Sequence, residues 1–469
     1  MSLISRPTCC LLAVSVFSLA QSHSADWSNW RGPLTTGAAP GANPPTHWSE
    51  SSNVVWKVKI PGAGTSTPII SGNLIFLQSA IPTGRKIEPE PKPAEAAPQA
   101  TPPPPAPAGE GGGSERRRRG PGGGGGGGGG MRAEKPNEFH QFAVIALDRK
   151  TGAIRWQTAV KEELPHEGHH RDHGFASHSP VTDGETLFGY FGSRGLHALG
   201  FDGKIKWSKD LGQMRTRNSF GEGSSPALHG NSLVVQWDHE GEDFIAAFDK
   251  NTGKELWRQK RDEPTTWSTP LILSHEGVEQ VIASSTGRVR SYELTSGKQL
   301  WECAGMTVSV IPTPMTGFGM VYVMSGFRGA ALLAITLGKQ GDLTGTDAIR
   351  WQLAKSTPYV PSGLLSGERI YFFSGNNGLL SIVDAKSGAV KVDAQRIEGL
   401  SGVYASPVAA AGRVYLTGRD GTCVVIKDSD SVEVLGVNRL TDRIDASPAV
   451  VGQQLFLRGH QHLYCLAAQ

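Results

Sequence analysis

Cysteine is scarce in this chain of 469 residues, which holds five cysteines and no Cys-x-x-Cys pair. Cys9 and Cys10 lie in the first apolar segment, and Cys303, Cys423 and Cys465 are spread over the rest. An odd number of widely spaced cysteines argues against a framework of disulfides. All three lie in strand-like segments, so we expect them to be small buried side chains.

Long apolar runs are also missing. The apolar run at 9–20 is too short to span a bilayer. Arg6 precedes this run and small residues follow it, a pattern that predicts a signal peptide over residues 1–24. Cleavage after Ala20 or after Ser24 would satisfy the small-residue rule. We therefore expect an exported protein, either periplasmic or secreted, with no membrane span.

Several catalytic signatures are absent. The sequence contains no His-Glu-x-x-His and no Gly-x-Ser-x-Gly elbow on a strand-to-helix turn. The segment GEGS at 221–224 lacks the lysine and the helix of a phosphate-binding loop. These absences argue against a zinc protease of that type, a serine hydrolase and a nucleotide-binding loop.

Neither sign of charge dominates the sequence. Lys and Arg total 46 against 43 Asp and Glu, which gives a net charge of +3. Part of the excess comes from the arginine run at 116–119. A broad basic face is therefore not expected, which argues against a nucleic-acid partner. We also expect a monomer.

What the sequence does contain is an internal repeat. The segments ALDRKTGAIRW at 146–156, AFDKNTGKELW at 247–257 and YELTSGKQLW at 292–301 share a Thr/Ser-Gly turn followed by Trp. An Asp at the start of such a turn accepts backbone N–H groups, and Gly supplies the positive φ of a tight hairpin. We expect the Trp to lie on an outer strand and to pack against the next repeat.

A second marker is a small hydroxyl residue beside proline, followed by an alternating apolar run. It occurs at Thr67, Ser179, Ser225, Thr269, Thr313, Ser406 and Ser447, and in reversed order at Ser362. The eight units, each with four short β-rich runs, predict an all-β fold, an eight-bladed β-propeller, with seven blades as the alternative. Because the last unit ends at 462–469 before an outer strand, residues 54–61 are predicted to close it.

These patterns divide the chain into a signal peptide at 1–24, an N-terminal extension at 25–53 and a propeller at 54–469. Residues 81–137 interrupt the first blade with a segment rich in Pro, Arg and Gly. Such a composition does not bury enough apolar surface to order itself, so we predict a disordered insertion there.

The template Ala-x-Asp-x-x-Thr-Gly-x-x-x-Trp, matched in full at 146–156 and 247–257, resembles the pyrroloquinoline-quinone (PQQ)-type propeller repeat. The segment DWSNWRGP at 26–33 is similar to the start of secreted bacterial PQQ-binding-like β-propeller repeat proteins. The resemblance covers the mature chain outside the insertion. It implies the propeller fold, and it leaves the function open, because fold alone does not assign chemistry.

Two better-understood branches share this repeat. Quinoprotein alcohol dehydrogenases bind PQQ and a calcium ion over the axis, and they carry a disulfide between adjacent cysteines. Here the only adjacent pair, Cys9-Cys10, lies in the predicted signal peptide. The other branch is BamB, an eight-bladed scaffold without catalysis. The resemblance therefore favours a non-catalytic binding propeller, with PQQ and calcium as the cofactors of the alternative.

The loops predict where a ligand would bind. In a four-stranded blade, the loops between the second and third strands share one face with the crossings into the next blade. Polar residues that depart from the repeated turn chemistry gather on this face, where ligands usually bind. The candidate residues are Arg194, Arg217, Asn218, Asp238, His239, Glu240, Arg288, Arg328, Asn376, Asn377, Arg419, Asp420 and Asp445.

One crossing, LPHEGHHRDHGFASHSP at 164–180, holds five of the fourteen histidines and is called the His-rich stretch below. His178 lies beside the next marker and is expected to belong to the strand that follows. The remaining candidates for a divalent metal are His166, His169, His170, Asp172 and His173. A polar crossing loop that bonds its neighbours is the alternative.

Three functions remain open from the sequence. The first is an exported, non-catalytic binding or scaffold protein that holds a partner protein, or a polyol or polyanion, on the loop face. The second is a PQQ-dependent oxidoreductase. The third is a metal-dependent hydrolase that uses the histidines at 166–173.

Overall fold

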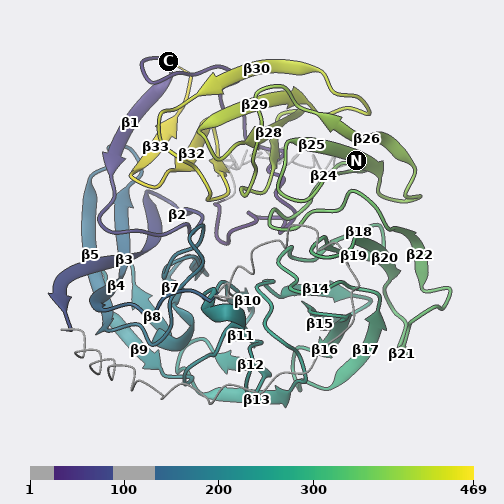
Figure 1. Ribbon diagram of the computed structural model, residues 1–469, viewed down its shortest axis with the longest axis horizontal. Helices are drawn as coiled ribbons and strands as arrows, with labels where there is room; N and C mark the ends of the chain where they lie inside the picture. The colour runs from purple at the N-terminus through teal and green to yellow at the C-terminus, as the bar shows by residue number, and fades with distance from the viewer. Residues whose placement is uncertain (1–25, 88–131, 469) are drawn as a thin grey trace, which may run out of the picture.

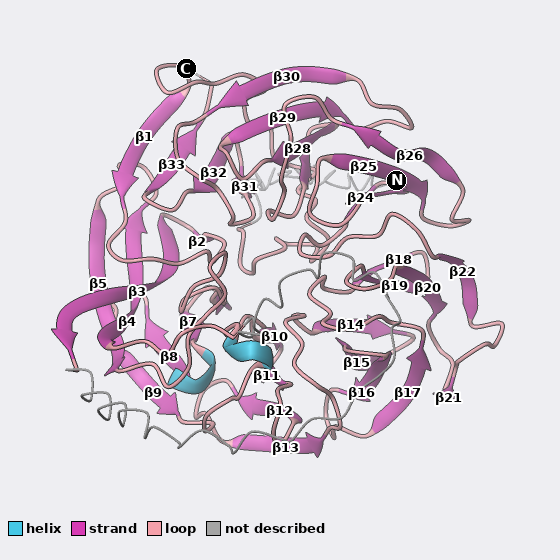
Figure 2. Cartoon of the chain, in the orientation of Figure 1, coloured by secondary structure: helices cyan, strands magenta, loops and turns pink. Residues whose placement is uncertain are grey.

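Each repeat folds into one antiparallel sheet, and the eight sheets surround a common axis like the blades of a propeller (Figure 1). The computed structural model describes residues 26–87 and 132–468. Apart from two short 3-10 helices, η1 (Gly192–Arg194) and η2 (Arg217–Ser219), the regular structure of this part is strand (Figure 2). The predicted all-β, eight-bladed fold is therefore confirmed.

In each of blades 1 to 4, the four strands follow one another in chain order from the axis outward. Blade 1 contains β2 (Ile69–Ser71), β3 (Leu74–Lys86), β4 (Glu138–Asp148) and β5 (Ile154–Glu163). Blade 2 contains β6 (Val181–Thr182), β7 (Thr186–Tyr190), β8 (Leu196–Gly200) and β9 (Ile205–Lys209). Blade 3 contains β10 (Ala227–His229), β11 (Ser232–Trp237), β12 (Phe244–Asp249) and β13 (Glu255–Lys260). Blade 4 contains β14 (Leu271–His275), β15 (Val278–Ser284), β16 (Arg288–Glu293) and β17 (Gln299–Ala304).

Blades 5 to 8 repeat the pattern with two variations. Blade 5 contains β18 (Met315–Gly317), β19 (Met320–Ser325), β20 (Ala331–Thr336) and β22 (Ile349–Leu353), and its β21 (Gly341–Asp342) pairs in parallel with β17. Blade 6 contains β23 (Leu364–Ser366), β24 (Arg369–Phe373), β25 (Leu379–Asp384) and β26 (Val390–Arg396). Blade 7 contains β27 (Val408–Ala410), β28 (Arg413–Thr417), β29 (Thr422–Lys427) and β30 (Val434–Arg439). Blade 8 contains β31 (Ala449–Val451), β32 (Gln454–Arg458), β33 (His462–Leu466) and, outermost, β1 (Val54–Lys59).

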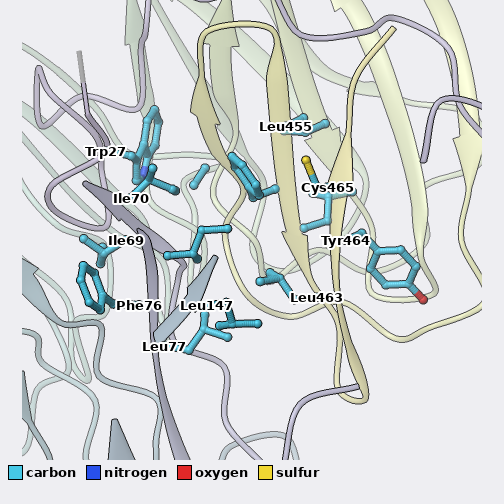
Figure 3. Packing of buried hydrophobic residues seen from close by; sticks show 14 of the residues in the cluster. Trp27, Ile69, Ile70, Phe76, Leu77, Leu147, Leu455, Leu463, Tyr464 and Cys465 are labelled. Carbon is cyan, nitrogen blue, oxygen red and sulfur yellow. The ribbon is translucent and has the colours of Figure 1, made fainter. Parts of the chain in front are cut away.

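Ring closure follows the prediction. Strand β1 pairs antiparallel with β33, with Trp56 opposite Cys465 and Val58 opposite Leu463. The first and last parts of the chain therefore share one sheet, which removes an open edge from the ring. Buried side chains of blade 8 and blade 1 pack together beside this seam, with Trp27 among them (Figure 3).

The repeated Trp holds neighbouring blades together. Trp207 Nε1 in blade 2 donates to the carbonyl of Lys250 in blade 3 at 2.9 Å, and Trp156 makes the same contact to Phe201 one blade earlier at 2.7 Å. The Trp207 ring also covers Gly253, where an added Cβ would lie 2.7 Å from the ring. The predicted contact between the Trp and the next repeat is therefore confirmed, and it explains why the turn requires Gly.

The hydroxyl markers link the blades at the axis. The N–H of Thr67 donates to Ser179 Oγ at 2.9 Å, and the N–H of Ser179 donates to Ser225 Oγ at 2.9 Å. The same bond recurs from Ser225 to Thr269, Thr313 to Ser362, Ser362 to Ser406 and Ser406 to Ser447. We call this set the hydroxyl belt. It gives the marker a structural reason, since six of the eight hydroxyls accept a buried N–H of the preceding blade, and Thr313 Oγ1 instead donates to the carbonyl of Thr269.

The two faces of the ring are arranged as predicted. The turn between the first and second strands bonds the turn between the third and fourth, as in Arg149 N to Asn73 O at 2.8 Å and Lys250 N to Asn231 O at 3.0 Å. We call this side the turn face. The opposite side, with the remaining loops and crossings, is the loop face.

The N-terminal extension is an ordered strap along the inner strands near the turn face. Trp27 exchanges backbone hydrogen bonds with Ile70 in blade 1. Arg31 reaches the far side of the axis, where its Nη2 donates to the carbonyl of Gly363 at 2.7 Å and to that of Pro407 at 3.2 Å. The strap therefore spans the turn-face end of the axis before the chain enters β1.

Strand β3 continues through Lys86, so residues 81–86, which the sequence analysis assigned to the insertion, belong to the sheet. They do so because β4 is extended to match, with Ile81 opposite Gln141. The rest of the insertion, residues 88–131, and the predicted signal peptide lie outside the described residues.

The three remaining cysteines are free and buried, as predicted. Burial raises the pKa of the Cys303 thiol to about 11 and those of Cys423 and Cys465 to about 12. They therefore stay protonated and act as small apolar side chains. No helix in residues 26–87 or 132–468 is long and apolar enough to cross a membrane.

Candidate functional site: the axial pocket

A pocket of about 430 Å³ lies on the propeller axis and opens on the loop face. Every blade contributes to its wall. Trp30 of the N-terminal strap lines both this pocket and a smaller cavity on the strap side, and it therefore forms the floor.

The wall consists of two rings of residues with a fixed spacing in the sequence. The lower ring is part of the hydroxyl belt, and the upper ring is formed by the residue two positions before each marker. The upper ring consists of Thr65, Ser177, Gly223, Trp267, Ile311, Val360, Tyr404 and Asp445. Blades 1 to 3 thus contribute small residues, blades 4 to 7 bulky apolar or aromatic ones, and blade 8 a carboxylate.

Aromatic rings cover one side of the pocket. Trp267 is held in place because its Nε1 donates to the carbonyl of Gly221 at 2.7 Å. Phe327 and Tyr359 stack on each other with ring centroids 4.8 Å apart and planes 23° apart. Tyr404 of blade 7 and Phe220, whose ring meets that of His170 edge-on at 4.9 Å, also line the pocket. The result is a set of fixed flat surfaces with few rotatable bonds.

The opposite side is polar, and His173 is its best-defined donor. The N–H of Gly174 donates to His173 Nδ1 at 2.8 Å, and Ser177 Oγ lies 2.7 Å from the same nitrogen. Burial lowers the pKa of His173 to about 3, so the ring is neutral near neutral pH. Because Nδ1 accepts, the hydrogen lies on Nε2. No protein group of the described chain accepts it, and His173 lines the pocket.

An ion-pair network stands at the rim. Asp172 accepts from Arg419 Nη2 at 2.9 Å and from Arg443 Nη2 at 2.8 Å. The Nε atoms of both arginines bind Asp445, at 2.6 Å and 3.1 Å, and His460 Nε2 lies 2.9 Å from the same carboxylate. Asp172 thereby fastens the His-rich stretch to blades 7 and 8 across the mouth of the pocket.

The predicted metal ligands are dispersed. His166 Nε2 contacts the carbonyl of Met214 at 2.6 Å, and His169 Nδ1 contacts that of His170 at 2.8 Å. His170, Asp172 and His173 line the pocket, but Asp172 is engaged by arginines. Within the described ranges, no group of three or more His, Cys, Asp or Glu side chains is placed to hold a metal ion. The geometry favours the polar crossing loop.

Four of the predicted loop-face residues are occupied by structural contacts. Arg194 is buried and bonds Glu163 at 2.9 Å and Glu222 at 3.0 Å. Asp238 is buried against Arg261 Nε at 2.7 Å. The other two contacts are His239 Nδ1 with the N–H of Arg215 and Arg288 with Glu302.

The other loop-face candidates fall into three groups: side chains that bond nearby loops, members of the rim network, and side chains without an ion pair in the described chain. Asn376, Asn377 and Asp420 accept backbone N–H groups of Val360, Leu379 and Thr422, and Glu240 accepts from Thr265. Asn218 is exposed. Arg419 and Asp445 belong to the rim network, and Asp445 also lines the pocket. The guanidinium groups of Arg217 and Arg328 form no ion pair with the described residues.

Sequence reasoning missed the aromatic side of the pocket. The signal was present, because Trp267, Ile311 and Tyr404 each stand two residues before a marker. The marker had been interpreted only as the start of an inner strand. Its position on the axis makes the residue two places earlier a lining residue in every blade.

Comparison with known proteins follows the fold. The profile of a family described as outer membrane protein assembly factor BamB matches residues 141–390 and 245–469, which together exceed half of the chain. A search of the curated proteins found no match.

Solved structures with the same architecture include two alcohol-oxidising dehydrogenases. The quinohemoprotein alcohol dehydrogenase from Comamonas testosteroni is 8% identical, with a TM-score of 0.57 over 95% of this chain and 81% of that one. A europium-containing methanol dehydrogenase is 10% identical, with a TM-score of 0.56 over 94% and 91%. BamB from Moraxella catarrhalis is 12% identical, with a TM-score of 0.48 over 70% and 93%. At these identities the likeness extends to the fold alone.

Proposed function

Because the chain belongs to the family of the outer membrane protein assembly factor BamB, we propose that it is an exported, non-catalytic binding or scaffold propeller. Its loop face is the binding face in this proposal, and the occupant is a partner protein held around the mouth of the axial pocket. The predicted signal peptide and the family's name both support a location in the cell envelope or outside the cell.

The observation that carries the proposal is the asymmetry of the axis. The strap and Trp30 close the turn-face end, and the pocket opens on the loop face. Around that opening, Arg217 and Arg328 carry guanidinium groups without ion pairs in the described part of the chain. Unpaired Arg beside aromatic rings is a common composition of protein-binding surfaces.

The residues around the axis do not fit the calcium and PQQ of the quinoprotein enzymes. A calcium ion takes six to eight oxygen ligands, several of them carboxylate oxygens. The two carboxylates that line the pocket, Asp172 and Asp445, are each bonded to Arg419 and Arg443. No adjacent cysteine pair occurs among the described residues. We therefore derive no catalytic step through a quinone. The histidines at 166–173 are too dispersed to form the metal centre that a metal-dependent hydrolase needs.

Charge reversal on the two faces tests the proposal. The protein is tagged, expressed in its own host and cross-linked before isolation, and partners are quantified by mass spectrometry. The test variant is Arg217→Glu with Arg328→Glu on the loop face. Lys254→Glu with Lys298→Glu is the matched control, because both lysines are exposed in turn-face hairpins and the charge change is equal.

We expect wild type and the turn-face variant to retain the same partner and the loop-face variant to lose at least about tenfold of it. Reciprocal isolation through the tagged partner should give the same order. Loss of the partner in the turn-face variant alone would refute the loop face as the binding face.

A further inference from the structure

We propose that the axial pocket is a carbohydrate site, which takes one neutral sugar ring from the loop face. The proposal rests on the proposed function only in using the same face. It adds a second, small ligand to a surface that otherwise meets a partner protein.

The first argument is the two-sided wall. A sugar ring has an apolar face of C–H groups and a polar edge of hydroxyl groups. The aromatic side, with Trp267 and Tyr359, offers flat surfaces on which such a C–H face can pack. The polar side, with His173 and Ser177, lies opposite and meets the hydroxyl edge.

The second argument is the unused hydrogens of the hydroxyl belt. Ser179, Ser225, Thr269, Ser406 and Ser447 each accept one N–H through the side-chain oxygen. In the described chain, no protein acceptor takes the hydroxyl hydrogen of any of these five. All five line the pocket, so their O–H groups are available to a ligand. His173 Nε2–H adds a sixth donor.

The third argument is the balance of donors, acceptors and charge. An alcohol group both donates and accepts, so its site needs acceptors beside the belt. Asp172, Asp445 and the Tyr404 hydroxyl provide them at the rim. Arg419 and Arg443 balance the two carboxylates, and His173 is neutral. These four side chains thus carry no net charge, so a neutral, hydroxyl-rich ligand fits better than an ion, which would need an unpaired countercharge in the wall.

Size agrees with this class of ligand. The pocket volume of about 430 Å³ lies within the range of roughly 300 to 1,000 Å³ typical of small-molecule sites. Because the floor is closed by Trp30, a longer glycan would insert one terminal residue and extend out over the loop face.

The experiment uses the mature full chain and a panel of defined sugars. The probes are glucose, galactose, mannose, N-acetylglucosamine, maltose and cellobiose, tested by saturation-transfer NMR and titrated by tryptophan fluorescence. Pyrroloquinoline quinone is included as a planar anionic competitor. Ile311→Trp fills the upper ring without removing a hydrogen bond, and Leu256→Trp makes a comparable change on an exposed outer strand.

We expect at least one sugar to bind, with about tenfold weaker binding in Ile311→Trp and unchanged binding in Leu256→Trp. Tyr359→Leu, which removes part of the aromatic side, should weaken binding as well and serves if Ile311→Trp fails to fold. Binding of no sugar, binding that survives both pocket variants, or binding of the quinone alone would overturn the proposal. Partner retention in the charge-reversal experiment is measured separately, so failure of the sugar site leaves that result standing.

Discussion

The two faces of the ring follow opposite rules. On the turn face the same contact recurs: an Asp accepts the N–H of the residue three positions later at 2.8 Å. It occurs at Asp148, Asp249 and Asp384. In the upper ring of the pocket, by contrast, no two blades carry the same residue type. Repetition therefore marks what the fold needs, and divergence marks where a ligand can be recognised.

The largest expected effect comes from removing a Trp that holds two blades together at the turn face. Trp207→Ala removes the ring that covers Gly253 and the hydrogen bond to Lys250. We expect it to lower the free energy of unfolding by about 3 kcal/mol, measured by guanidinium denaturation. The exposed Leu256→Ala is the control and should change stability by less than about 0.5 kcal/mol. A Trp207→Ala loss no larger than the control's would show that the repeat is not structural.

Acid should lower the free energy of unfolding, because two histidines on the loop-face side are buried in the neutral form. Burial lowers the pKa of both His173 and His178 from 6.5 to about 3, so the unfolded chain binds protons that the folded chain excludes. The contribution of these neutral histidines to the free energy of unfolding is complete above about pH 6.5 and is lost as the pH falls toward 3. The loss is about 1.4 kcal/mol per pH unit for each histidine.

His178→Phe sharpens this comparison. Both ring nitrogens of His178 are buried with no hydrogen-bond partner among the described residues, and the ring packs edge-on against Tyr190. Between pH 6.5 and pH 5 the variant should lose about 2 kcal/mol less stability than wild type, by denaturation at each pH. Parallel pH profiles of the two proteins would contradict the assignment of the acid sensitivity to His178.

A smaller effect is expected from the rim network. Asp172→Asn removes the charge that joins the His-rich stretch to Arg419 and Arg443, both partly exposed. We expect a loss of about 1 to 2 kcal/mol, together with faster hydrogen exchange confined to residues 165–178. If exchange became faster in the turn-face hairpins instead, the rim network would not be what holds the His-rich stretch in place.

The smallest effect concerns the free arginines. Arg217→Glu with Arg328→Glu should change the free energy of unfolding by less than about 0.5 kcal/mol, since neither guanidinium has an ion-pair partner in the described residues. A thermal melt beside the Lys254→Glu, Lys298→Glu control measures this. A large loss would mean that lost binding by the loop-face variant reflects instability.

The fold was predictable because its signals are local and repeated. The Thr-Gly-Trp turns and the markers near Thr67 and Ser447 lie within short windows. The last unit ends before an outer strand, which predicted its completion by residues 54–61. The site was less predictable, because its contacts join distant segments. Asp172 meets Arg419 across 247 residues, and Trp30 reaches the axis from a segment outside the repeat. Burial also separates the structural Arg194 from the free Arg328, although both stand in similar loops.

Site-specific photo-cross-linking in living cells tests the central claim most directly. A photoreactive amino acid is incorporated at position 328 on the loop face or at position 254 on the turn face, and adducts are resolved by mass. The account predicts a discrete adduct from position 328 and none from position 254. An adduct from position 254 with none from position 328 would contradict the loop face as the binding face.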